Sequence, residues 1–221
     1  MHVEVEPQAK AQLTTTGATR LYRSSPSRPE AVQISEIIVR EQGLLEYLPD
    51  PLIPFAGSRY RQETRIELGS DAGLFWWEMV TPGREASGEF FDYELLDLKL
   101  EIKTADRTIA YERTRLTPRL HRLDSPARLG HYRYFCSFYI CRVGLEAARW
   151  LAWEKEIGEL TEQLTNPAEV LWGVSTLPAH GLIVRGLGIN SRQMFPGLMS
   201  LWRAAKLKLY GCEAIPPRKV W

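Results

Sequence analysis

Two stretches in which polar and apolar side chains strictly alternate constrain this fold more than any other feature. In RQETRIEL, Arg61, Glu63, Arg65 and Glu67 share one face, and Gln62, Thr64, Ile66 and Leu68 share the other. In LLDLKLEIK, Asp97, Lys99, Glu101 and Lys103 lie opposite Leu96, Leu98, Leu100 and Ile102. Side chains along a β-strand point to opposite faces in turn, so both stretches are predicted to be strands with one solvated face. TADR then leads into TIAYERTRL, which predicts a hairpin.

Most of the remaining chain also carries strand signals. Five further segments are rich in β-branched and aromatic residues: VQISEIIVR (32–40), LFWWEMV (74–80), YRYFCSFYICRV (132–143), AEVLWGVS (168–175) and GLIVRGL (181–187). Such residues suit the pleated, half-buried surface of a sheet. The sequence therefore predicts a mainly β fold.

Two segments instead have helical periodicity. EAARWLAWEKEIGELTEQL places Trp150, Trp153, Ile157, Leu160 and Leu164 at steps of three and four residues, and it stops before Asn166-Pro167. NSRQMFPGLMSLWRAAKLKLYG has Leu198, Leu201, Trp202, Ala205 and Leu209 on one side. Asn190 or Ser191 is the expected N-cap of this second helix, and Gly211 follows its end.

Length and charge exclude several classes of protein. The 221 residues suit one domain, and we expect a single domain over residues 1–221, with RSSPSRPE (23–30) as its one candidate for a mobile loop. The 28 Lys and Arg residues nearly balance 27 Asp and Glu residues, so nucleic acid is not an expected partner. No signal peptide or membrane-length apolar run is visible, and Cys136, Cys141 and Cys212 are too few for a disulfide framework. We therefore expect a cytoplasmic protein with no membrane partner.

Motifs for nucleotide binding are incomplete. GREASGEF (83–90) has the glycine spacing of a phosphate loop, but Glu89 and Phe90 stand where Lys and Ser or Thr are required. GLGINS (186–191) lacks the third glycine of a dinucleotide fingerprint. Both segments are predicted to be turns, the second between a strand and a helix.

Catalytic and metal motifs are not visible either. Cys136 and Cys141 are five residues apart in a strand, so they point to opposite faces, one expected in the core and one on the surface. The four histidines are scattered, and GVSTL around Ser175 lacks the second glycine of a nucleophile elbow. We expect no enzyme activity and no tight metal site.

The run LEYLPDPLIPFAGSRY (45–60) is the most unusual stretch. Its three prolines remove backbone donors and fix φ, so LPDPLIPF is not expected to be an ordinary central strand. A stiff crossing between strands is predicted, holding Glu46 and Asp50 before it and Arg59, Tyr60 and Glu63 after it. A rigid loop with solvated charges is the plainer alternative.

This run, continued as LEYLPDPLIPFAGSRYRQET, closely resembles the signature region of the UreD/UreH family of urease accessory proteins. TTTGATRLYRS, PGREASGE, LGHY and YGCEAIPPRKVW resemble related segments of that family, so the likeness covers nearly the whole chain. The resemblance implies a β-helix-like stack of strands with two helices. Family members usually begin with several more strands and a glycine-rich segment, so it also implies a UreD-like domain that lacks those N-terminal strands.

The resemblance further implies a chaperone role. Such a protein works with a UreF-like helical protein and a UreG-like GTPase to load nickel into apo-urease, and nickel would be a transient cargo. A protein that passes an ion onward must hold it weakly, and dispersed carboxylates bind Ni²⁺ less tightly than thiolate or imidazole clusters do. The candidate polar lining or partner surface comprises Glu46, Asp50, Arg59, Tyr60, Glu63, Glu78, Arg84 and Glu89.

Two other functions remain open at this point. A β-helix-like scaffold with acids and aromatic rings could act on a polysaccharide through two carboxylates about 5–10 Å apart. A protein-interaction module without a metal role is the second alternative. An exposed acid pair flanked by unburied tryptophans would favour the first, and a gene neighbourhood without urease genes would favour the second.

Overall fold

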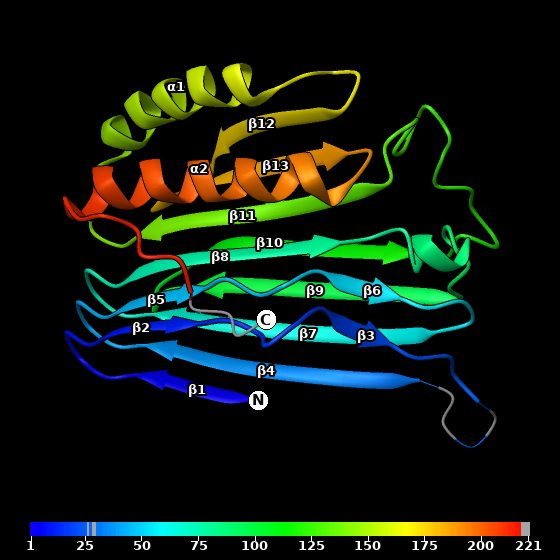
Figure 1. Cartoon of the computed structure of the whole chain (residues 1–221). Coiled ribbons are helices and arrows are strands. Elements are labelled where there is room, and N and C mark those ends of the chain that lie inside the picture. The colour runs from blue at the N-terminus through cyan, green and yellow to red at the C-terminus, as the bar shows by residue number, and fades with distance from the viewer. Residues whose placement is uncertain (26, 28–29, 218–221) are drawn as a thin grey trace.

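In the computed structural model two β-sheets are stacked face to face, and two helices cover one of them (Figure 1). The structure describes all residues except 26, 28–29 and 218–221. The RSSPSRPE loop and the YGCEAIPPRKVW segment therefore lie partly outside the described residues. Neither helix has the length and apolar character needed to span a membrane.

The first sheet, sheet A, contains both alternating stretches of the sequence. Its strand order is β1-β4-β7-β9-β10, from strands β1 (His2–Val5), β4 (Ala31–Val39), β7 (Arg59–Leu68), β9 (Leu95–Lys103) and β10 (Thr108–Leu116). The first four strands are parallel, and β9 and β10 form the predicted antiparallel hairpin. In β7 the even-numbered positions are buried and the odd-numbered ones are exposed or half-buried, as the alternation predicted.

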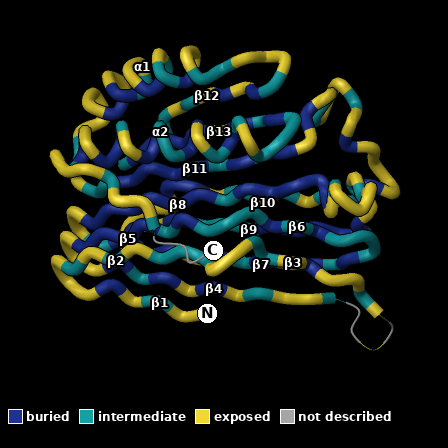
Figure 2. The backbone as a smooth tube through the Cα atoms, in the orientation of Figure 1, coloured by how far each residue is buried: buried dark blue, intermediate teal, exposed yellow. Residues whose placement is uncertain are grey.

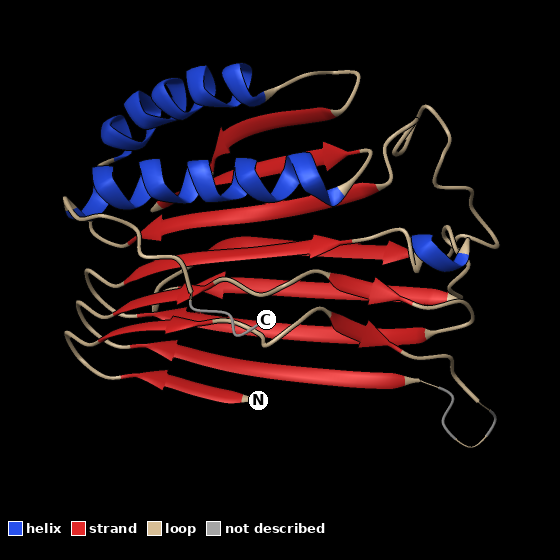
Figure 3. Cartoon of the chain, in the orientation of Figure 1, coloured by secondary structure: helices blue, strands red, loops and turns tan. Residues whose placement is uncertain are grey.

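The second sheet, sheet B, runs in the order β12-β13-β11-β8-β5-β2. Its strands are β2 (Lys10–Leu13), β5 (Leu44–Tyr47), β8 (Gly73–Val80), β11 (Tyr134–Arg142), β12 (Val170–Thr176) and β13 (Gly181–Gly188). Short strands β3 (Thr19–Leu21) and β6 (Leu52–Pro54) extend it. From β1 to β9 the chain passes alternately between the two sheets, and its parallel strands stack, which is the β-helix-like arrangement that was predicted (Figure 3).

Helices α1 (Ala147–Leu164) and α2 (Ser191–Tyr210) pack on the face of sheet B that points away from sheet A (Figure 3). Trp150 and Trp153 of α1, and Leu201 and Trp202 of α2, belong to the resulting core. The Asn190 side chain accepts a hydrogen bond from the Arg192 N–H at 3.0 Å, and Gly211 ends α2 in the left-handed conformation. Both helices thus begin and end close to the predicted residues.

Two further apolar clusters fill the space between the sheets. Figure 2 shows the buried residues concentrated in the strands, with exposed residues on the turns and the outer sides of the helices. Cys136 packs against the helices, whereas Cys141 packs between the sheets. The opposite orientation was predicted correctly, but the expected surface position is wrong, because sheet B is covered on both faces and both thiols are buried.

The turns predicted at the two glycine motifs are present. Residues 83–90 form a loop with a single 3-10 turn, Glu85–Ser87, and Gly83 and Gly88 have positive φ. GLGINS joins β13 to α2. The proline-rich run differs from its prediction, because it is two short strands of sheet B, β5 and β6, with a break between them, and only residues 55–58 cross to sheet A.

Candidate functional site

Sheet B is interrupted at the same level in two neighbouring segments, β2–β3 and β5–β6. Between β5 and β6 the chain leaves the ladder at residues 48–51, and between β2 and β3 it leaves at residues 14–18. The chain segments at the two breaks are hydrogen-bonded to each other. The Thr14 hydroxyl donates to the Leu48 carbonyl at 2.7 Å, and the Asp50 N–H donates to the Thr15 hydroxyl at 2.8 Å. The Thr15 hydroxyl is also 3.2 Å from an Asp50 carboxylate oxygen. The prolines explain the break, since Pro49 and Pro51 cannot donate to a ladder.

Next to these breaks is a cavity of about 310 Å³ between the sheets. Its wall includes polar side chains from both sheets and from the breaks: Thr15, Thr19, Gln33, Tyr47, Asp50, Gln62, Thr64 and Glu78. A separate apolar groove of about 330 Å³, under α2, is lined by Phe195 and Met199 and shares Asp50 with this cavity. Asp50 therefore lies where the outer groove meets the space between the sheets.

Glu78 lies at the inner end of the polar cavity. It comes from β8, where Trp76, Glu78 and Val80 face sheet A and Trp77 and Met79 face the helices. The Gln62 side-chain amide of β7 donates a hydrogen bond to the Glu78 carboxylate, and the Tyr60 hydroxyl donates to the Gln62 carbonyl oxygen at 3.0 Å. These bonds hold a carboxylate in the middle of the sandwich.

A second, smaller cavity of about 30 Å³ continues from Glu78 to Glu112 of β10. This volume is enough for about two water-sized species. Glu112 accepts hydrogen bonds from the Tyr139 hydroxyl and, at 3.3 Å, from the Ser137 hydroxyl of β11, and it pairs with Arg185 of β13 at 3.1 Å. Asp50, Glu78 and Glu112 thus mark a row of cavities that crosses the sandwich between its two sheets.

Burial raises the pKa of Glu78 to about 7, with a further increase from the nearby Glu112 charge, while the Gln62 hydrogen bond acts in the opposite direction. Burial also raises the pKa of Tyr60. Within the described residues there is no group of three or more His, Cys, Asp or Glu side chains able to hold a metal ion. A carboxylate that is readily protonated near neutral pH, with hydroxyl and amide neighbours, suits weak and reversible contact with a cation.

The raised pKa predicts a specific pH dependence of folding stability. The Glu78 carboxyl group has a pKa of about 7 in the folded chain and about 4.5 in the unfolded chain. Binding of its proton therefore stabilises the folded state, and this stabilisation is complete below pH 4.5 and is lost as the pH rises through 7. Relative to Glu78→Gln, the wild-type free energy of unfolding should fall by roughly 2–3 kcal/mol between pH 5 and pH 8. Denaturant titrations of both proteins at the two pH values measure this difference. A difference that stays constant with pH would contradict the inferred titration.

The other predicted residues do not join this row. Glu46 faces α2, where its carboxylate accepts hydrogen bonds from Trp202 Nε1 at 2.7 Å and Lys206 Nζ at 2.6 Å. Arg84 and Glu89 pair with each other in the loop after β8, and this pairing lowers the pKa of Glu89 to about 2. Each therefore has a structural partner of its own.

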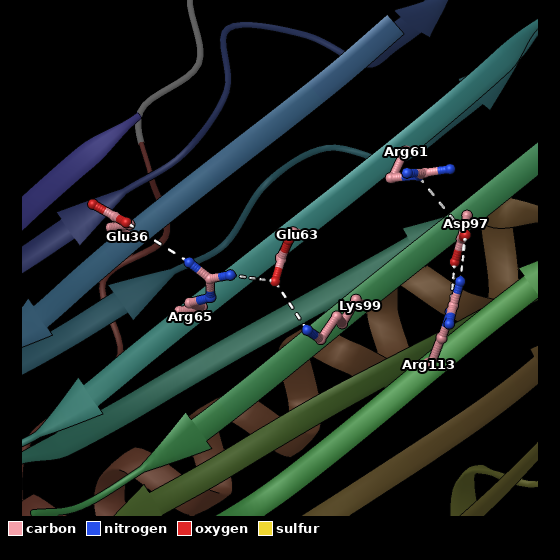
Figure 4. Close-up of polar contacts among 7 residues, drawn as sticks. All are labelled: Glu36, Arg61, Glu63, Arg65, Asp97, Lys99 and Arg113. Atoms are coloured by element: carbon pink, nitrogen blue, oxygen red, sulfur yellow. Dashed lines mark hydrogen bonds and ion pairs between the residues drawn. The ribbon is translucent and has the colours of Figure 1, made fainter. Parts of the chain in front are cut away.

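Arg59 and Glu63 point outward from sheet A. Arg59 pairs with Glu94 at 3.5 Å, and Glu63 pairs with Lys99 at 2.9 Å and Arg65 at 2.7 Å. Figure 4 shows the surrounding ion pairs, in which Asp97 is held by Arg113 through two hydrogen bonds. This outer face is a strongly charged sheet surface, separated by sheet A from the row of cavities.

Several residues of the row were missed from sequence, namely Thr15, Tyr47, Gln62, Glu112, Ser137 and Tyr139. The inward position of Glu112 could have been recognised from the sequence, because two-residue steps place it on the same face of β10 as Ala110 and Thr114, and this face points inward. An acid on the inner face of an alternating strand needs a polar partner across the core. The identity of that partner requires the sheet pairing.

Comparison with known proteins places the chain in context. A family model described as "UreD urease accessory protein" matches residues 1–221. The chain is 46% identical to Urease accessory protein UreD of Herpetosiphon aurantiacus over 219 residues, covering 99% of this chain and 76% of that protein. It is 36% identical to the protein of the same name from Pseudomonas aeruginosa strain UCBPP-PA14, covering 99% and 73%, and 29% identical to that from Bacillus sp. strain TB-90, covering 99% and 77%.

Proposed function

Because this chain belongs to the UreD family of urease accessory proteins, we propose that it is a non-catalytic chaperone that assists nickel insertion into apo-urease. Its partners in this role are a UreF-like helical protein, a UreG-like GTPase that hydrolyses the GTP, and apo-urease. The setting is the cytoplasm, and nickel is a passing cargo. The observation that carries the proposal is the 46% identity to a urease accessory protein over 99% of the chain.

The row of cavities suggests how this chain takes part. In our proposal the cation enters beside Asp50 at the paired breaks of sheet B, contacts Glu78 between the sheets, and leaves near Glu112. Each step offers one carboxylate, with hydroxyl or amide neighbours at Asp50 and Glu78 and with two hydroxyls and Arg185 at Glu112, so no position holds the ion in a closed cage. The proline-rich run supports the entrance, because its break brings Asp50 to the edge of the polar cavity.

Co-expression tests the function as a whole. Urease subunits and the other accessory proteins should give active, nickel-loaded urease when this chain is present and mostly inactive apo-urease when it is omitted. Activity and bound nickel per urease active site are the two measurements. Full activity without this chain would contradict the proposed role, and normal nickel loading without activity would assign it a different step.

A further inference from the structure

The two sheets of the sandwich have unequal widths. Sheet A ends at β10, whereas sheet B continues past β11 with β13 and β12 (Figure 1). Glu112 of β10 contacts Ser137 of β11 and Arg185 of β13, so the edge of sheet A lies above β11 and β13. The inner face of β12 therefore extends beyond the edge of sheet A.

The free side of β10 is an open strand edge. Thr108–Leu116 pairs with β9 on one side, and within the described part of the chain no other strand pairs with it. Unpaired N–H and C=O groups along an edge are a template for another strand. With nine residues at about 3.3 Å each, β10 offers an edge about 30 Å long.

The overhanging part of sheet B forms a floor beside this edge. Leu171 of β12 is 40% exposed, Leu187 of β13 is half-buried, and these two residues are paired neighbours. Arg185, paired with Gly173, adds a side chain that is 58% exposed. A strand added next to β10, about 4.8 Å away from it, would cover this floor as the other strands of sheet A cover the rest of sheet B.

The charges around the edge favour an acidic occupant. Arg115 and Arg113 are exposed on the outer side of β10, where Arg113 pairs with Asp97 at 2.9 Å, and Arg185 lies on the inner side, where it pairs with Glu112 at 3.1 Å. Glu112 is the acid next to the floor, and its oxygens already accept hydrogen bonds from two hydroxyl groups and Arg185. These three arginines outnumber the two acids that they contact, so the edge keeps an excess positive charge. Such an edge discourages non-specific pairing and favours an occupant that supplies carboxylates.

We propose that the free edge of β10 docks an extended, acidic segment of a partner protein, which adds a further strand to sheet A above β12 and β13. This inference rests on the proposed function only in assuming that the chain works inside a complex. Backbone hydrogen bonds to β10 would provide affinity, and carboxylates facing Arg185 and Arg115 would provide selectivity.

Amide hydrogen exchange distinguishes strand addition from other docking. The chain is compared alone and in complex with each co-expressed partner, the UreF-like protein and apo-urease in turn. Because the N–H groups of an edge strand alternate between its neighbour and solvent, every second amide of β10 should exchange fast alone and slowly in one of the complexes. The edge strand β12 is the internal control, and its outward amides should stay fast.

Two substitutions test the same edge. Arg185→Glu should weaken binding of that partner about tenfold or more through like-charge repulsion. Lys155→Glu, the same reversal of charge on the exposed side of α1, should leave binding unchanged. Of Thr114→Pro and Arg115→Pro, one removes a ladder bond to β9 and the other removes only a free donor. The proline variant that keeps the wild-type melting temperature should bind the partner more weakly.

The outcomes separate the two proposals. If no urease component is recovered with the tagged chain, the proposed function fails. If a partner is recovered but β10 remains unprotected and Arg185→Glu binds as wild type does, the strand-addition proposal alone is wrong. Protection of β10 in a dimer of this chain without any partner would also overturn it, since the occupant would then be a second copy.

Discussion

Glu78→Gln should reduce urease activation by about tenfold or more while leaving this chain folded and bound to its partners. Two unit charges about 4 Å apart attract by about 4 kcal/mol at an effective dielectric constant of 20, and each 1.4 kcal/mol added to a barrier slows a step tenfold. The amide keeps the size of the side chain but removes the charge from the middle of the row. The measurement is the initial rate of urease activation by the purified complex at fixed nickel concentration.

Glu63→Gln is the matched control for this change. It removes the same charge from β7, the strand that precedes β8 in the chain, but on the outer face of sheet A, where Glu63 pairs with Lys99 and Arg65. Activation should stay near the wild-type rate, since exposed pairs contribute about 0–1 kcal/mol. Equal rates for Glu78→Gln and wild type would exclude Glu78 from the proposed path of the ion, and equal losses for both variants would point to a general charge effect.

Glu46→Leu should lower the free energy of unfolding by about 3–5 kcal/mol, because it leaves the Lys206 ammonium buried without its partner. The side chains of Glu46 and Lys206 are only 7% and 10% exposed, and Trp202 donates to the same carboxylate. This predicted loss is the largest that we expect from a single substitution of a charged residue in the sandwich. Thermal and denaturant unfolding measure it.

Adding Lys206→Met should restore much of this loss, since replacing both members of a buried pair by apolar residues is often close to neutral. Lys208→Met is the control on the same helix, where the exposed pair with Glu156 should contribute about 0–1 kcal/mol. If the double variant is no more stable than Glu46→Leu, then Trp202 and the fit of α2 on sheet B, rather than the unpaired ammonium, determine the cost.

Local sequence patterns were sufficient to predict the elements that have one solvated face. The alternation in β7 and β9 identified both strands and their inner faces, and the apolar stripes of α1 and α2 identified both helices and their ends. Short strands were missed, among them β1, β2 and β3, because three or four residues carry too little periodicity and are held by parallel pairing with distant strands.

In the candidate site, too, some features were predicted from the sequence and others were decided only by the tertiary structure. The sequence alone predicted that Glu46 and Asp50 lie before a stiff crossing and that Glu78 belongs to a polar lining or partner surface. The alternation already placed Glu63 on the solvated face of its strand, whereas the tertiary structure decided that Glu46 turns to α2 and that Glu78 turns inward.

The physical reason is that a sequence pattern specifies which residues share a face, whereas burial depends on what covers that face. Sheet B is covered on both sides, so an acid on either face must find a partner, and Glu46 and Glu78 find theirs on opposite sides. Those partners, Lys206 and Gln62, come from other elements, 160 residues away for Glu46 and 16 for Glu78. The sequence determined the longer strands, the helices and their polar faces, and only the stacking of the sheets determined which polar faces meet.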